Sequence, residues 1–314
     1  MYRTGAPATA APPVTLGLSG AWRRAFDDPP FAEPDPALHA YMADMLRAHR
    51  LPLAEERLTQ GMSYGEMAAD LLAAEMTADC PVDVLIFAFA VPDVAPWRAT
   101  ASYLSHMCPG SPFAFAVCDA GAGAPFAALR LILEYASTGG CRRALLVAAE
   151  QAAMPFQPPV PVVTPARHAV VALRCDQSRP GGLEARPDGA QPVGARPEGV
   201  RLGTVRTHAG IAPAPACALL AEAAADLAAG HDLITVLGAS LAAGIDPGGL
   251  PGEVISAPPE QPCTGVLWEV AGRLPGWASR AGRGEQGGRV LLADYDPVLG
   301  HLCLASIEIP GERR

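Results

Sequence analysis

The segment Ser111–Gln151, SPFAFAVCDAGAGAPFAALRLILEYASTGGCRRALLVAAEQ, constrains the fold most, because it has the pattern of a strand, a glycine-rich turn, a helix and a second strand. Apolar residues alternate with small ones from Phe113 to Val117, which is typical of a half-buried strand. The chain then passes through Gly121 into a helix that Pro125 opens. Such a strand-to-helix elbow presents one residue and several backbone N–H groups to a pocket. The pattern therefore predicts an α/β fold whose chemistry lies at this turn.

The neighbouring segments continue the same α/β alternation. Ser63 and Glu66 form a capping-box pattern at the start of a predicted helix. The apolar run Val82–Phe89 follows as a strand, and a further strand, Ala144–Ala149, ends at Glu150. Together these segments continue the alternation of helices and strands on both sides of the elbow.

A second half of similar organisation follows a segment of different composition. Residues 176–199 are rich in Pro, Gly and charge and contain the near-repeat ARPDG and ARPEG, a composition that does not form a packed core. We therefore expect an N-terminal half over 1–175, a linker over 176–199 and a C-terminal half over 200–314. The elements predicted for the C-terminal half are Val200–Val205, Leu233–Leu237, Val290–Ala293 and Leu302–Ile309 as strands, and Ala212–Ala229 and Val266–Leu274 as helices.

Composition narrows the class of protein. The 314 residues are 50% hydrophobic, enough for a large core, and no run reaches the length of a membrane span or a signal peptide. We expect a soluble, cytoplasmic protein without a membrane partner. The 8 cysteines show no C-x-x-C pair, so neither disulfides nor a metal site is expected. A net charge of −9 disfavours nucleic acid, and no cofactor motif is present.

The elbow and its flanks resemble ketoacyl synthase III and the wider thiolase superfamily. In that family the turn reads roughly D-V-x-A-A-C-S-G ahead of an alanine-rich helix, and a later strand carries G-D-G-A, which is degraded here to Ala166-Arg167-His168-Ala169. The resemblance covers roughly residues 60 to 175. It implies a thiolase-like five-layer αβαβα architecture of two pseudo-equivalent βαβαβ halves. It also implies a homodimer in which the strand Phe113–Val117 pairs across a two-fold axis.

The family's three catalytic side chains are replaced in this sequence. The resemblance puts Gly121 at the position of the catalytic cysteine, Gly238 at that of the histidine, and Cys263, followed by Thr264, at that of the asparagine. Decarboxylative condensation needs a thiolate to hold the acyl chain and neutral donors for the developing enolate. We therefore expect no ordinary condensation from this chain.

Replacement groups for proton transfer are expected from the same cavity. His208 aligns with a pocket wall, and Tyr295 and Asp296 fall where the family has a glycine-rich oxyanion loop. We assign proton transfer to His208, Cys263 and Asp296. Substrate contacts are assigned to a second set: Cys118, Gly121, Gly238, Thr264 and Tyr295. The two glycines are expected to make room for a bulky hydrophobic small molecule. A surface histidine at 208 and a solvated turn at 295–296 are the plainer alternatives.

Three functions remain open from the sequence. The first is a cyclase that forms a carbon–carbon bond in a reactive hydrophobic intermediate, similar to the ketosynthase-like cyclases of bacterial carbazole-alkaloid pathways. The second is a noncatalytic partner subunit, like the chain-length factor of a heterodimeric ketosynthase. The third is an acyltransferase using Cys118, although Asp119 beside it is expected to raise the pKa of that thiol.

Overall fold

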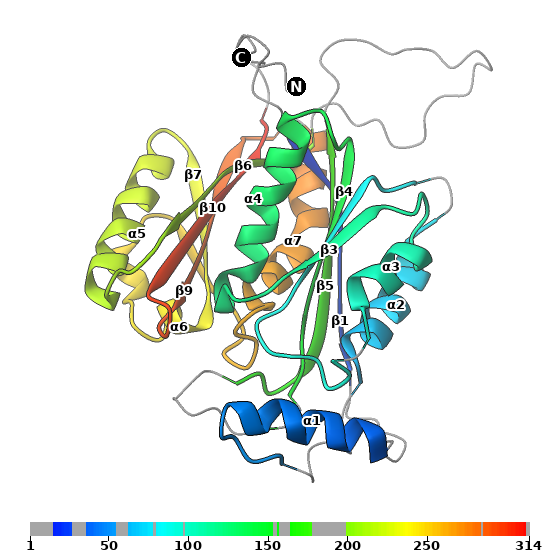
Figure 1. Cartoon of the computed structure of the whole chain (residues 1–314). Coiled ribbons are helices and arrows are strands. Elements are labelled where there is room, and N and C mark those ends of the chain that lie inside the picture. The colour runs from blue at the N-terminus through cyan, green and yellow to red at the C-terminus, as the bar shows by residue number, and fades with distance from the viewer. Residues whose placement is uncertain are drawn as a thin grey trace, which may run out of the picture.

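A computed structural model describes most of the chain (Figure 1). The described residues are 15–26, 36–54, 62–77, 80–96, 98–152, 156, 164–177, 199–283 and 285–311.

The described strands form one 10-stranded sheet, in the order β3-β2-β4-β5-β1-β6-β10-β9-β7-β8. The first half contributes β1 (Leu16–Phe26), β2 (Val84–Ala88), β3 (Phe113–Val117), β4 (Arg143–Glu150) and β5 (His168–Gln177). Strand β2 lies parallel to both β3 and β4, while β5 runs antiparallel to β4 and β1. Every residue of β2 and nearly every residue of β4 is buried, as expected for strands covered on both faces.

The second half repeats this topology. It contributes β6 (Arg201–His208), β7 (Asp232–Leu237), β8 (Glu253–Ser256), β9 (Gly288–Asp296) and β10 (His301–Ile309). The order β8-β7-β9-β10-β6 matches β3-β2-β4-β5-β1 strand for strand, with β7 parallel to β8 and β9. The halves join through a short antiparallel ladder between β1 and β6. The predicted pair of equivalent halves is therefore present.

Helices form layers against both halves of the sheet. Helices α4 (Ala124–Ser137) and α7 (Gly265–Gly282) lie between the two halves, as Figure 1 shows. Helices α2 (Tyr64–Glu75) and α3 (Thr100–Met107) cover the outer face of the first half, and α5 (Pro213–Ala228) and α6 (Ala239–Ala242) that of the second. A further helix, α1 (Pro36–Ala48), precedes them. The order of layers is thus αβαβα.

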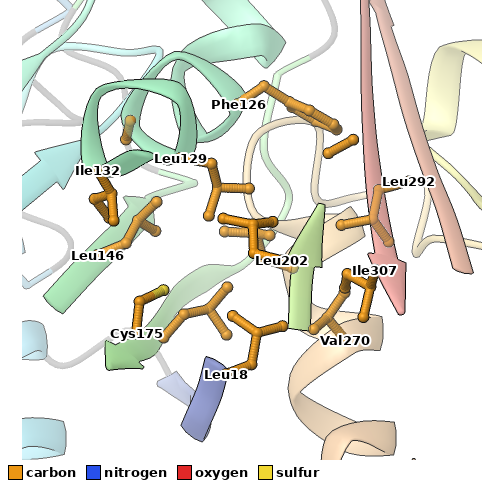
Figure 2. Close-up of a cluster of buried hydrophobic side chains, with 14 of the residues drawn as sticks. Leu18, Phe126, Leu129, Ile132, Leu146, Cys175, Leu202, Val270, Leu292 and Ile307 are labelled. Atoms are coloured by element: carbon orange, nitrogen blue, oxygen red, sulfur yellow. The ribbon is translucent and has the colours of Figure 1, made fainter. Parts of the chain in front are cut away.

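The middle layer holds the largest buried core. Figure 2 shows Leu129 of α4 and Val270 of α7 among side chains of both halves, such as Leu146 and Leu292. Since each fully buried side chain of this size contributes about 1.5–3 kcal/mol, this layer fixes the two halves against each other. It therefore also fixes the starts of α4 and α7, which follow the turns at Gly121 and Cys263.

Local sequence signals explain several element ends. Ser63 caps α2, and the reciprocal bonds with Glu66 confirm the predicted capping box. Pro125 lies in the first turn of α4, as predicted. The predicted end of α7 at Leu274 is wrong, because the helix continues past Pro275 and buries Trp277 against the middle core.

The predicted linker is only partly described. Asp176 and Gln177, assigned to it from sequence, instead end β5, where Arg143 forms an ion pair with Asp176. Residues 178–198 lie outside the described residues, so the linker and the domain boundaries stay predictions. Within the described ranges, no helix is both long and apolar enough to cross a membrane.

Candidate active site

The elbow between β3 and α4 contains a glycine whose side-chain space is occupied by a carboxylate. Gly121 begins the short turn Gly121–Gly123 with φ +53°, a conformation that favours glycine. The Ala122 N–H donates to Asp296 Oδ2 at 3.0 Å. A Cβ added to Gly121 would lie 1.7 Å from the same oxygen. Asp296, from the end of β9, therefore takes the place that a side chain at position 121 would use.

The hairpin between β9 and β10 holds this carboxylate in place. Val298 and Leu299 each donate a backbone N–H to Asp296 Oδ1 at 2.9 Å. With the Ala122 N–H, the carboxylate accepts three backbone hydrogen bonds, which fix its position at the turn. The elbow thus carries an anchored carboxylate.

The second glycine predicted at the site has the same relation to another aspartate. Gly238 follows β7, and an added Cβ there would lie 2.0 Å from Asp294 Oδ1. Asp294 and Asp296 are two residues apart on β9, so both point to the inner face of the sheet. Burial raises the pKa of Asp294 well above its usual value, and the nearby Asp296 and Glu150 charges raise it further.

These two contacts correct the expectation that Gly121 and Gly238 leave room for a bulky substrate. The space is filled by the carboxyl groups of Asp296 and Asp294. A glycine removes a side chain from its own position, but the neighbouring strand determines what enters that space.

Glu150 links the two halves beneath these groups. Its carboxylate accepts hydrogen bonds from the Cys263 N–H at 2.9 Å, the Thr264 N–H at 3.3 Å and the Thr264 hydroxyl. The side chain is 1% exposed, and burial raises the pKa of Glu150 to about 7, against the lowering effect of these three bonds. Thr264 therefore holds Glu150 and is not free to contact a substrate.

Cys263 lies in this group as a buried thiol. It is 2% exposed, and burial, with the charges of Glu150 and Asp294, raises its pKa well above the usual value. A thiol in this environment stays protonated, so Cys263 acts as a small packed group and not as a nucleophile or a base.

His208 and Tyr295 face away from the elbow. Antiparallel pairing aligns His208 with Leu302 and Leu302 with Tyr295, and cross-strand partners share one face of a sheet. Tyr295 is 5% exposed and packs in the outer core, where its hydroxyl donates to the Ile211 carbonyl at 2.9 Å. The next residue pair, Thr207 and Cys303, shares the inner face with Asp294. The predicted pocket positions of His208 and Tyr295 are therefore wrong, because the period of two puts them on the outer face.

Cys118 precedes the turn and is exposed. Partial burial and the adjacent Asp119 charge raise its pKa, as the sequence predicted. The thiolate that an acyltransferase needs is therefore disfavoured at this position.

Two further features of the described structure were considered as functional sites: a surface hollow and clusters of metal-ligating side chains. A hollow of about 810 Å³, lined in part by His231, Arg289 and Glu308, lies at the opposite end of β9 and β10 from Asp296. The described residues contain no cluster of three or more His, Cys, Asp or Glu side chains suited to a metal ion.

Comparisons with known proteins agree on the fold. Neither protein-family models nor curated proteins give a match to this chain. Among solved structures, a variant of OleA from Xanthomonas campestris is 14% identical, with 95% of this chain and 99% of that chain covered and a TM-score of 0.55. AbyA1, a tetronic acid condensing enzyme, is 15% identical, with 93% and 99% covered and a TM-score of 0.55. The 3-oxoacyl-(acyl carrier protein) synthase III of Pseudomonas aeruginosa PAO1 is 15% identical, with 95% and 99% covered and a TM-score of 0.51. The predicted thiolase-like, ketoacyl synthase III-like fold is confirmed.

Two residues of the site were not assigned to it from sequence. Asp294 is missed, although its spacing from Asp296 in ADYD is the period that puts both on one face. Glu150 was interpreted as a structural residue at a strand end, where the resembled family commonly has a glutamate that supports the elbow, and it was not assigned to the site. Its partners are more than 100 residues away, and no local pattern predicts them.

Proposed function

We propose that this chain is a ketoacyl synthase III-like enzyme that closes a ring by forming a carbon–carbon bond, without covalent capture of its substrate. The observation that carries the proposal is the Asp296 carboxylate, which occupies the side-chain space of the elbow and accepts the Ala122 N–H. A carboxylate fixed at a strand-to-helix turn of a condensing fold is placed to take a proton, whereas a glycine there holds no acyl group.

The proposed reaction needs no redox step. Asp296 removes a proton from a carbon next to a carbonyl group, and the resulting enolate carbon attacks a second carbonyl carbon of the same molecule. One carbon–carbon bond forms, the attacked carbonyl becomes an alkoxide, and that oxygen then takes up a proton. The bond-forming step is intramolecular because both carbonyl groups belong to one molecule, so binding has only to hold them close together.

The substrate class follows from the surroundings. The middle layer that flanks the elbow is apolar, which favours a hydrophobic polycarbonyl small molecule. The net charge of −9 disfavours nucleic acid. The predicted link to specialised metabolism, including carbazole alkaloids or polyketide-derived products, belongs to this proposal. So does a cytoplasmic location, which the free cysteines among the described residues favour.

Proton removal can be measured without knowing the natural substrate. Incubation with acetoacetyl-N-acetylcysteamine in D₂O is expected to show accelerated exchange of the protons between its two carbonyl groups, followed by NMR. The Asp296→Asn variant should lose about 10²- to 10⁴-fold of that acceleration, the usual contribution of a general base.

Asp232→Asn is the matched control, because Asp232 is an exposed aspartate at the start of β7 in the same half of the sheet. With this control variant, the substrate protons should exchange at the same rate as with the wild type. Equal exchange rates for the wild type and Asp296→Asn would show that Asp296 is not the base.

A noncatalytic partner subunit is a second candidate, because Asp294 and Asp296 fill the space at Gly238 and Gly121 with the chain's own atoms. Such a subunit would shape the pocket of an active ketosynthase. It predicts no exchange by the chain alone, and restoration of activity on mixing with a catalytic subunit. The acyltransferase alternative at Cys118 has no supporting contact, since the pKa of that thiol is raised.

The expected homodimer has a suitable surface. Strand β3 lies at one edge of the sheet, and Phe113 on it is 60% exposed. An exposed edge strand with an aromatic side chain is prone to pair with a second copy. We therefore expect light scattering to give a dimer mass for the wild type and a monomer mass for Phe113→Asp. A monomeric wild type would contradict this proposal.

A further inference from the structure

Asp294 shares the inner face of β9 with Asp296 but has a different environment. Its pairing partner Cys303 lies beneath the elbow, where a Cβ on Gly123 would approach the Cys303 Sγ to 2.7 Å. The Asp294 carboxyl occupies the space beside Gly238. One strand therefore delivers a carboxyl group to each of the two glycine positions.

Asp294 is buried without a counter-charge. It is 3% exposed, and within the described residues its only hydrogen bond is the Tyr295 N–H to Oδ1 at 2.8 Å. No ion pair of the described residues includes it, although arginines and aspartates elsewhere in the described structure form ion pairs. Burying a carboxyl group with so little compensation opposes folding, and an apolar residue of similar size would be more stable there. Stability therefore does not account for an aspartate at this position.

Burial and the neighbouring charges favour the neutral form of the Asp294 carboxyl group. Burial raises the pKa of Asp294, and the carboxylates of Asp296 and Glu150 raise it further because a second negative charge close by is unfavourable. Asp296 differs because three backbone N–H groups bind its carboxylate. Two carboxyl groups on one face thus have different environments, because one accepts three backbone N–H groups at the turn and the other is buried and accepts one. Different environments for two neighbouring carboxyl groups are the arrangement expected for an acid and a base.

We propose that Asp294 is the general acid of the ring closure, donating its proton to the alkoxide oxygen that forms when the enolate carbon attacks the second carbonyl. The proposal rests on the proposed function and deepens it. In the full cycle Asp296 gains the proton that leaves carbon and Asp294 loses the proton that reaches oxygen. One proton passing from Asp296 to Asp294, directly or through water, restores both groups.

The two proton transfers can be measured separately. A linear diketone with three methylene carbons between its carbonyls reports ring closure, because the hydroxy ketone that forms then loses water to give a conjugated cyclohexenone with strong ultraviolet absorbance. Deuterium exchange next to a carbonyl of the same diketone reports proton removal alone. We expect Asp294→Asn to lower the rate of ring closure about 10²- to 10⁴-fold. The fold-loss in the rate of exchange should be at least ten times smaller than the fold-loss in ring closure. Asp296→Asn should lower both rates by the same factor.

A pH profile of the wild type tests the inference even if Asp294→Asn does not fold. Because the acid must be protonated, the ratio of ring closure to exchange should fall about tenfold per pH unit above the pKa of Asp294. This fall should be absent in folded Asp294→Asn and present in the control Asp232→Asn. A ratio that is independent of pH, or equal losses of both rates in Asp294→Asn, would overturn the role of Asp294. Absence of exchange by the wild type would instead remove the proposed function itself.

Discussion

Replacing Gly121 by alanine is expected to lower the free energy of unfolding by about 3 kcal/mol. An alanine Cβ would lie 1.7 Å from Asp296 Oδ2, so the carboxylate must leave its hydrogen bond to Ala122. Loss of hydrogen bonds to a charged group costs about 1.5–3 kcal/mol each, and alanine at φ +53° adds about 1 kcal/mol of backbone strain. Chemical denaturation of the purified variant measures the total.

Gly139→Ala is the matched control for this prediction. Gly139 also has a positive φ, +76°, but nothing lies within 4 Å of an added Cβ. Only the backbone strain remains there, about 1 kcal/mol. Removing the Asp296 carboxyl in Gly121→Ala/Asp296→Ala should reduce the cost at position 121 to the same level. An equal cost for Gly121→Ala with and without Asp296 would show that the carboxylate does not fill this space.

The second large effect concerns Glu150 and pH. Its pKa is raised from 4.5 to about 7 in the folded protein, so the folded state binds this proton more tightly than the unfolded state. Its contribution to stability is therefore fully present below pH 4.5 and is lost as the pH rises through about 7. At about 1.4 kcal/mol per pH unit, the loss is about 3 kcal/mol over this range.

Glu150→Gln removes this dependence and keeps an oxygen that accepts from Cys263 and Thr264. Denaturation of the wild type and the variant should therefore give curves that diverge by about 3 kcal/mol between the two pH limits. Glu253→Gln, an exposed glutamate on β8, serves as the control and should follow the wild type. Parallel curves for the wild type and Glu150→Gln would contradict the buried, proton-binding state of Glu150.

Local patterns predict the elements that their own residues specify. The capping box at Ser63, the strand before Gly121 and the helix after Pro125 are found because the determining contacts lie within a few residues. Strand β1 was not predicted, since its pairing partner β5 is more than 100 residues away. The short strand β8 at the far edge was missed for a similar reason, because it has only β7 beside it.

The candidate site is predicted less well than the fold. The resemblance finds Gly121, Gly238 and Cys263, because each lies in a recognisable turn. It does not find what fills the space beside a glycine, because Asp296 comes from a strand 174 residues beyond Ala122. His208 and Tyr295 were assigned from nearness in sequence order, whereas the alternation of side chains along β6 and β9 sends them to the outer core. The face of the sheet on which a side chain lies, and not its chemical type, therefore separates Asp294 and Asp296 from His208 and Tyr295.

Intact-mass spectrometry after incubation with radiolabelled lauroyl-coenzyme A tests most directly whether this condensing fold works without covalent acyl capture. A ketoacyl synthase III that has the elbow cysteine serves as the positive control and should gain one acyl group. We predict an unchanged mass for this chain, with no label on any peptide, including those that contain Gly121 or Cys118. A stable acyl adduct on any cysteine would contradict the proposed mechanism.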